Sequence, residues 1–234
     1  MRKLILDSAF SSNKNTSEPQ WRFSTGIRAR HMRLNTLVLP LSYYNVRDET
    51  NTIVFGDGGT TKSATLKEGV YSGSQLADEV ARVLSEKGSQ TYTATFDIVT
   101  GKLTVSAPGT FKFISSGTTA SRILGLKGDT SPATTYTMPQ PVDLTGTQLL
   151  LVNIPEVSNG GAVVYVGRES LNILDAIPIT NDLGTVQVFT SHQPEFLDIN
   201  DQVLSEISIR LLDSATLKPL DLHGETFQVI LDIL

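Results

Sequence analysis

Side chains that could carry catalysis or bind a metal are few and scattered in this sequence. Its 234 residues include no cysteine, which excludes thiol nucleophiles, disulfides and cysteine-ligated metal sites. The three histidines, His31, His192 and His223, are far apart, and none falls in a metal-ligand spacing such as His-x-x-x-His. No Gly-x-Ser-x-Gly nucleophile elbow is present either. The sequence therefore predicts no catalytic residue, no metal ligand and no cofactor, and we expect a protein that is not an enzyme.

A glycine-rich segment over 56–63 comes close to a phosphate-binding loop. Gly56 and the pair Lys62-Ser63 have the separation of that motif, but Thr61 stands in the place of its second glycine. The residues that follow do not begin a helix, so the aligned backbone amides that cradle a phosphate would be missing. A β-turn is the preferred interpretation of this segment.

Three arginines alternate with less polar residues over 21–30. Period-two alternation puts Arg22, Arg28 and Arg30 on one face of a strand, and the opposite face carries Trp21, Phe23, Thr25, Ile27 and Ala29. Arg28, Arg30 and Arg33 could contact phosphates, but aromatic side chains for base stacking are not interleaved with these three, so the evidence for nucleic-acid binding is weak. A solvated strand face is one interpretation. The other, which we adopt as a hypothesis, places Arg22, Arg28 and Arg30 at a subunit interface against an acidic surface of a neighbouring subunit.

Charge is distributed unevenly along the chain. The net charge is −5 overall, but residues 1–50 carry +4 and residues 141–234 carry −10. Solvated faces on different strands would explain this asymmetry. The alternative is that the two ends face different partners, or each other's neighbours in an assembly.

The elements that must position these side chains are mostly short strands. Alternating or continuous apolar patterns predict strands over 21–30, 34–41, 52–55, 148–154, 162–166, 185–190, 203–212 and 226–234. Turn-rich connections between short strands favour an antiparallel jelly-roll sandwich over a parallel sheet. No run of 18 apolar residues exists, and Asp7 interrupts the apolar stretch at the N-terminus, so we expect no membrane span and no signal peptide.

One helix is predicted, inside a small αβ module. Ser72 and Gln75 have the spacing of a capping box, and the apolar stripe behind them consists of Leu76, Val80, Val83 and Leu84, with Gly88 ending the helix. A hairpin with Gly101 in its loop follows. We therefore expect three parts: an N-terminal arm over 1–20, a β jelly roll over 21–64 and 127–234, and an inserted αβ module over 65–126.

The order of several segments resembles a known protein family. These segments are Arg2-Lys3-Leu4-Ile5-Leu6-Asp7-Ser8, Leu39-Pro40-Leu41-Ser42-Tyr43-Tyr44-Asn45-Val46, Leu66-Lys67-Glu68-Gly69-Val70-Tyr71-Ser72-Gly73-Ser74-Gln75-Leu76-Ala77, the hairpin 96–105, Ile123-Leu124-Gly125-Leu126, Ile209-Arg210-Leu211-Leu212-Asp213 and Pro219-Leu220-Asp221-Leu222-His223-Gly224-Glu225-Thr226-Phe227. Together they resemble the penton and minor capsid proteins of icosahedral double-stranded DNA viruses with double-jelly-roll major capsid proteins. Virophages and polinton-like viruses are the nearest examples.

The resemblance implies a structural protein of the virion. It implies a jelly roll that forms a homopentamer at the capsid vertex, with itself, the major capsid protein of the same virus and a spike protein as partners, and with no sequence-specific contact to nucleic acid. It transfers no catalytic residue. Two alternatives stay open: a minor capsid or spike β-sandwich that binds a host receptor or glycan, and a hydrolase whose site is assembled from distant loops.

Overall fold

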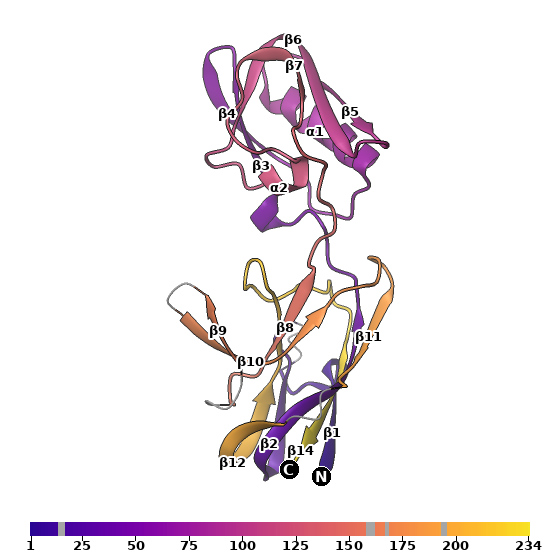
Figure 1. Cartoon of the computed structure of the whole chain (residues 1–234), viewed down its shortest axis with the longest axis vertical. Helices are drawn as coiled ribbons and strands as arrows, with labels where there is room; N and C mark the ends of the chain where they lie inside the picture. The colour runs from indigo at the N-terminus through magenta and orange to yellow at the C-terminus, as the bar shows by residue number, and fades with distance from the viewer. Residues whose placement is uncertain (14–16, 158–161, 167–168, 193–195) are drawn as a thin grey trace. The chain divides into compact units, whose positions relative to one another are not determined.

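The chain forms two compact units. The computed structural model describes residues 1–13, 17–157, 162–166, 169–192 and 196–234. Unit 1 consists of Met1–Tyr43 and Thr147–Leu234, and unit 2 of Tyr44–Gly146. Strands predominate in both units (Figure 1), and each pairing between the described strands is antiparallel. The predicted fold class, mainly β with antiparallel sheets, is confirmed.

A long strand organises the first sheet of unit 1. β2 (Gln20–Pro40) pairs with β14 (Gln228–Ile233) along one edge, and with β12 (Leu197–Ser208) and β11 (Val186–Thr190) along the other. β1 (Arg2–Asp7) pairs with β14 and completes the sheet. Figure 1 shows β1, β14 and β2 side by side near the two chain ends.

The second sheet of unit 1 closes a sandwich over the first. Its strand order is β13 (Arg210–Asp213), β8 (Leu149–Asn153), β10 (Glu169–Pro178), β9 (Ala162–Val166). Apolar side chains of both sheets form one core, which includes Trp21, Met32, Leu37, Leu150, Ile207, Phe227 and Leu231. This is the two-sheet packing expected of a jelly roll.

The N-terminal segment differs from the expected arm over 1–20. β1 is hydrogen-bonded into the sheet, and the indole of Trp21 donates to the backbone oxygen of Asp7 at 3.2 Å. The backbone amide of Ser8 donates to Phe227 at 3.0 Å. A strand that is paired along its whole length lies within the sandwich, so deleting residues 1–20 would remove a sheet strand together with the polar segment after it.

Two other strand predictions change in the structure. The segments expected at 21–30 and 34–41 are parts of one strand, β2. The strand expected over 203–212 is divided at Ile209, because the chain leaves the first sheet after β12 and enters the second sheet with β13. Ile209 is buried, and its backbone amide donates to Pro19.

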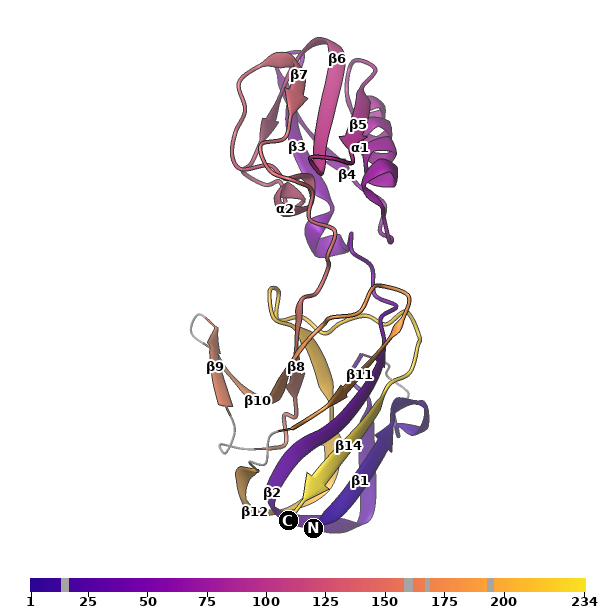
Figure 2. The same cartoon turned by 45° about the vertical axis from the view of Figure 1, so that its right-hand side comes forward.

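Unit 2 is a five-stranded sheet covered by one helix. The strand order is β4 (Thr60–Thr65), β3 (Thr52–Asp57), β6 (Lys102–Ile114), β5 (Thr93–Asp97), with β7 (Ala133–Thr137) also paired to β6. The helix α1 (Gly73–Lys87) packs on one face of the sheet, where it contacts mainly β5 and also β4 (Figure 2). Short helices lie at η1 (Ser8–Phe10) in unit 1, and at η2 (Asp48–Thr50) and α2 (Ser121–Leu124) in unit 2.

This unit is larger than the expected module over 65–126. Pairing of β3 with β6 brings Phe55 opposite Phe113, and both rings are buried in the core that α1 covers. β7, which follows the expected module in the sequence, also pairs with β6. The sheet therefore includes 44–64 and 127–146 in unit 2, whereas the sequence pattern assigns both segments to the jelly roll.

The predicted helix signals are confirmed. The backbone amide of Ser72 donates to the side chain of Gln75 at 2.9 Å, and the amide of Gln75 donates back to the Ser72 hydroxyl. The four stripe residues are buried. Gly88 caps the C-terminal end of the helix, and Gly101 adopts the expected positive φ, +67°.

Truncating the helix stripe should destabilise unit 2. Leu84 is fully buried, so Leu84→Ala should lower the free energy of unfolding by about 2 to 5 kcal/mol through lost burial and the cavity left behind. Urea unfolding followed by far-ultraviolet circular dichroism measures this change. Asp78→Ala, on the exposed face of the same helix, is the matched control and should change stability by less than about 0.5 kcal/mol. Equal effects of the two variants would contradict the packing.

Candidate functional site

Two of the three arginines singled out in the sequence have acidic partners within their own chain. The guanidinium of Arg28 donates two hydrogen bonds to the carboxylate of Asp201, at 2.9 and 2.7 Å. Arg22 lies 3.7 Å from Glu206. Both acids belong to β12, which pairs with β2. Part of the acidic surface that we expected on a neighbouring subunit is thus supplied by the same sheet.

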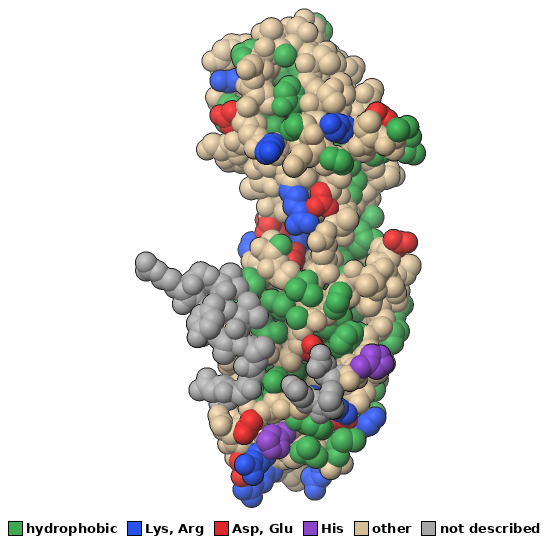
Figure 3. Space-filling view, in the orientation of Figure 1, with side chains coloured by type: hydrophobic (Ala, Val, Ile, Leu, Met, Phe, Trp, Pro, Cys, Tyr) green, Lys and Arg blue, Asp and Glu red, His purple; other side chains and the backbone are tan. Residues whose placement is uncertain are grey.

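Arg30 is placed differently. It is exposed, and no ion pair found within the described residues includes it. It lines a hollow of about 330 Å³ together with Met1, Arg2, Arg28, Asp201, Ile233 and Leu234. Hydrogen bonds from Arg28, with the charges of Arg28 and Arg30, hold the pKa of Asp201 below its usual value. Three arginine side chains against one aspartate leave this hollow, which we call the arginine hollow, with excess positive charge. Figure 3 shows Lys and Arg side chains gathered at the end of unit 1 that carries the chain termini.

Part of the outward face of the first sheet is apolar. Ile5, Val186 and Val188 are each more than half exposed. The strand register places Val188 beside Val38, and Ile5 beside Ile230, on the face opposite the core because successive side chains of a strand alternate. A group of exposed apolar side chains is a candidate surface for contact with another molecule. We call these five residues the outer apolar face.

The glycine-rich segment forms a hairpin, as the β-turn interpretation predicted. Asp57 pairs with Thr60 across a two-residue turn made by Gly58 and Gly59, whose φ angles are +57° and +81°. Two positive φ angles in succession are typical of a type I′ turn, which glycine adopts without strain. No helix follows the turn, because the chain continues as β4.

A buried carboxylate fixes the base of this hairpin. Asp57 is only 3% exposed and accepts hydrogen bonds from the Ser89 amide and from Gln90, the latter at 3.1 Å. The ammonium group of Lys62 lies 3.5 Å away. Burial opposes ionisation of Asp57, but the hydrogen bonds from Ser89 and the charge of Lys62 outweigh it, so the pKa of Asp57 lies below its usual value.

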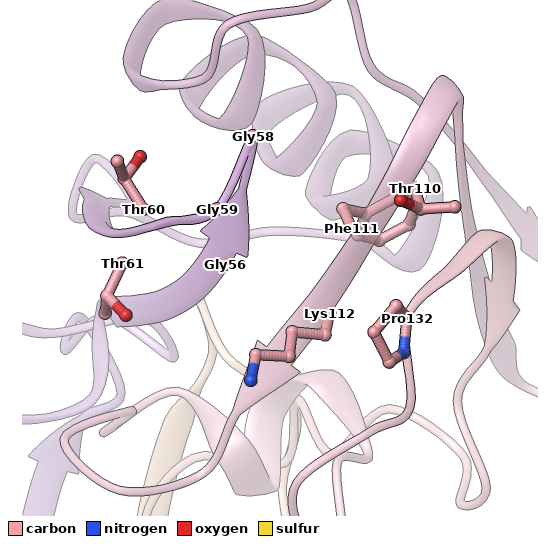
Figure 4. Close-up of a pocket in the computed structure, with 9 residues that line it drawn as sticks. All are labelled: Gly56, Gly58, Gly59, Thr60, Thr61, Thr110, Phe111, Lys112 and Pro132. Atoms are coloured by element: carbon pink, nitrogen blue, oxygen red, sulfur yellow. The ribbon is translucent and has the colours of Figure 1, made fainter.

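A half-open hollow lies beside the hairpin and has a volume of about 350 Å³ (Figure 4). We call it the hairpin hollow. It is lined by Gly56, Gly58, Gly59, Thr60, Thr61, Thr110, Phe111, Lys112 and Pro132. Sequence reasoning stopped at the glycines and missed this site, because Thr110, Lys112 and Pro132 join it only through the pairing of β3 with β6 and of β6 with β7.

The structure adds no metal centre to these surfaces. Within the described part of the chain, no group of three or more His, Asp or Glu side chains could hold a metal ion. His223 lies 3.6 Å from Asp221, its neighbour in the same loop. None of the helices among the described residues has the length and apolar character needed to cross a membrane.

The carboxylate of Asp57 should make the stability of unit 2 depend on pH. A depressed folded-state pKa contributes stability that is present above the ordinary carboxyl pKa of about 3.9 and is lost as the pH falls through the folded-state value. Asp57→Asn should therefore lower the free energy of unfolding by about 1 to 3 kcal/mol near neutral pH, and the difference should shrink in acid.

Thermal melts at neutral and acidic pH measure both effects. Asp78→Asn is the control, since Asp78 is exposed on α1. A melting temperature of Asp57→Asn equal to that of the unsubstituted protein at neutral pH would contradict this role of Asp57.

Comparison with known proteins places the fold. No protein-family model matches the sequence, and no curated protein matches it. Among solved structures, the mavirus penton protein superposes with a TM-score of 0.55 at 8% identity, over 99% of this chain and 98% of that one. A chain of the Sputnik virophage, solved by cryo-electron microscopy, gives a TM-score of 0.46 at 10% identity, over 98% and 96% of the two chains. The fold that the sequence resemblance implied is confirmed by the likeness to the mavirus protein, which includes both units.

Proposed function

We propose that this chain is a structural protein of a viral capsid, and specifically the penton protein, five copies of which close the shell at a vertex. The observation that carries the proposal is the likeness of fold to the mavirus penton protein over nearly the whole of both chains. A likeness confined to one jelly roll would be compatible with many functions. A match over both units, one inserted into the other, is more specific.

The surfaces of unit 1 support a role in assembly. The outer apolar face exposes side chains such as Val188, 58% exposed, on a sheet whose other face packs into the core of unit 1. Burying such side chains in a subunit contact stabilises the association by a free energy of about 25 cal/mol per Å² of apolar surface removed from water. We propose that neighbouring copies meet over this face.

Charge supplies a second contact in the proposed assembly. We retain Arg22, Arg28 and Arg30 as interface residues, with Arg30 and the arginine hollow as the part whose positive charge is not balanced within the chain. In a ring, the same surface recurs at each subunit contact, so a weak pair is repeated around the symmetry axis. The major capsid protein and a spike protein are the further proposed partners, the virion is the proposed location, and no catalytic step is part of the function.

The oligomeric state tests the vertex role directly. Native mass spectrometry of the purified protein should give a species with five times the mass of the chain. A protein that stays monomeric at high concentration, both alone and with the major capsid protein, would contradict the proposal. A dimer or trimer would favour a minor capsid or spike component in place of the vertex.

Reversing charge in the arginine hollow should weaken the pentamer. Arg28→Glu combined with Arg30→Glu should shift the protein from pentamer to monomer at low salt, where screening is weakest. Arg30→Glu alone leaves the pair of Arg28 with Asp201 in place, and should raise the dissociation constant of each contact by about 1.5- to 5-fold, the range of an exposed ion pair.

The matched control reverses one charge elsewhere. Lys127 is an exposed lysine of unit 2, and Lys127→Glu should leave the oligomeric state unchanged. Sedimentation velocity measures all three variants. If Arg28→Glu with Arg30→Glu remains pentameric and instead loses affinity for DNA, the arginines contact the genome and the interface assignment is wrong.

A further inference from the structure

The hairpin hollow contains a lysine whose position depends on a glycine. Gly56 of β3 pairs directly with Lys112 of β6. A Cβ atom added to Gly56 would lie 3.0 Å from Cγ and 3.1 Å from Cε of Lys112, which is closer than ordinary contact. Figure 4 shows the Lys112 side chain extending from β6 toward β3. The bare backbone at Gly56 therefore lets the lysine stem lie across the strand and carry its ammonium group into the hollow.

The charge of Lys112 is not cancelled by an ion pair. None of the ion pairs among the described residues includes it. The charge of Lys112 acts on the carboxylate of Asp129. Hydrogen bonds from Ser115 chiefly lower the pKa of Asp129, and the positive charge of Lys112 lowers it further. The other nearby carboxylate, Asp57, is already held by Ser89, Gln90 and Lys62. Among the residues that line the hollow, Lys112 is the one that carries a charge.

The rest of the lining is suited to a ligand rich in hydroxyl groups. Thr60, Thr61 and Thr110 are exposed. The Thr60 hydroxyl donates to the backbone oxygen of Asp57 at 2.9 Å and can accept from a ligand, whereas the hydroxyls of Thr61 and Thr110 can both donate and accept. Pro132 supplies apolar surface, whereas Phe111 is only 2% exposed because its ring packs in the core of unit 2. A Cβ atom on Gly59 would meet nothing within 4 Å, so the mouth beside the turn is open. A volume of about 350 Å³ lies in the lower part of the range of small-molecule sites, about 300 to 1,000 Å³.

We propose that the hairpin hollow binds the terminal residue of an acidic glycan, with the Lys112 ammonium pairing the anionic group of the sugar. A single point charge selects one carboxylate or sulfate, the threonine hydroxyls match a polyol, and Pro132 offers apolar contact to the C–H groups of a sugar ring. A free phosphate or sulfate ion would pair with the lysine without contacting Pro132. The proposal goes beyond a capsid role, because it gives unit 2 an attachment activity, and it does not depend on the oligomeric state of the chain.

Ligand titrations by nuclear magnetic resonance test the site on the full chain. The probes are 3′-sialyllactose, N-acetylglucosamine 6-sulfate, lactose and inorganic phosphate. We expect at least one of the two acidic sugars to shift the amide signals of 56–61 and 110–112. The acidic sugar that binds more tightly identifies the anionic group as a carboxylate or a sulfate. Lactose should bind at least tenfold more weakly. Absence of binding by both acidic sugars, or phosphate binding as tightly as they do, would overturn the proposal.

Two variants connect the binding to the geometry. Lys112→Gln removes the charge and should weaken binding of the acidic sugar at least tenfold, whereas Lys127→Gln, the same change at an exposed lysine of the same unit, should leave it unchanged. Gly56→Ala keeps the charge but displaces the lysine stem, so it should also weaken binding. The amide spectrum of each variant verifies that unit 2 is folded. Unchanged affinity in folded Lys112→Gln would refute the role of Lys112.

Discussion

The hydrogen-bond ladders of β2 are the constraint on which unit 1 depends. This strand spans 21 residues and is paired along both edges, with β14 on one side and with β12 and β11 on the other. Its register decides which side chains of these three neighbouring strands enter the core, because a shift by one residue would reverse the two faces. Gly26 permits the close approach of β12: a Cβ there would lie 2.7 Å from Cγ1 of Val203.

The same ladders explain the uneven charge of the sequence. The basic N-terminal part and the acidic C-terminal part are neighbours within a single sheet, since β2 lies between β12 and β14. Cross-strand pairs form as a result: Arg22 with Glu206, Arg28 with Asp201, and Arg33 with Asp232.

Asp232 is fully buried. Burial opposes its ionisation, but hydrogen bonds from Asn35 and Arg33 hold the pKa of Asp232 below its usual value. The guanidinium of Arg33 lies over the ring of Phe196, with its central carbon 4.7 Å from the ring centroid. Much of the charge asymmetry is therefore balanced inside the chain.

The two units divide the proposed functions between them. Unit 1 has the outer apolar face and the arginine hollow, both of which suit contacts between proteins of a shell. Unit 2 is held by its own core and by the network around Asp57, which joins the hairpin to the loop after α1. Because this network fixes the hairpin, the lining of the hairpin hollow is preorganised, and a ligand need not pay to order it.

Local features of this protein could be predicted from its sequence, and long-range ones could not. The capping box of Ser72 and Gln75, the buried stripe of α1 and the turn at Gly58 and Gly59 depend on residues a few positions apart, so their spacing alone determines them. The segment order also indicated the fold. The partners of each strand, however, lie far along the chain: β1 pairs with β14, and Phe55 lies opposite Phe113. A strand edge offers the same amide and carbonyl groups whatever its side chains. Only the tertiary packing therefore decided that β1 belongs to the sandwich, that unit 2 extends over 44–146, and that Asp201 of the same sheet pairs with Arg28.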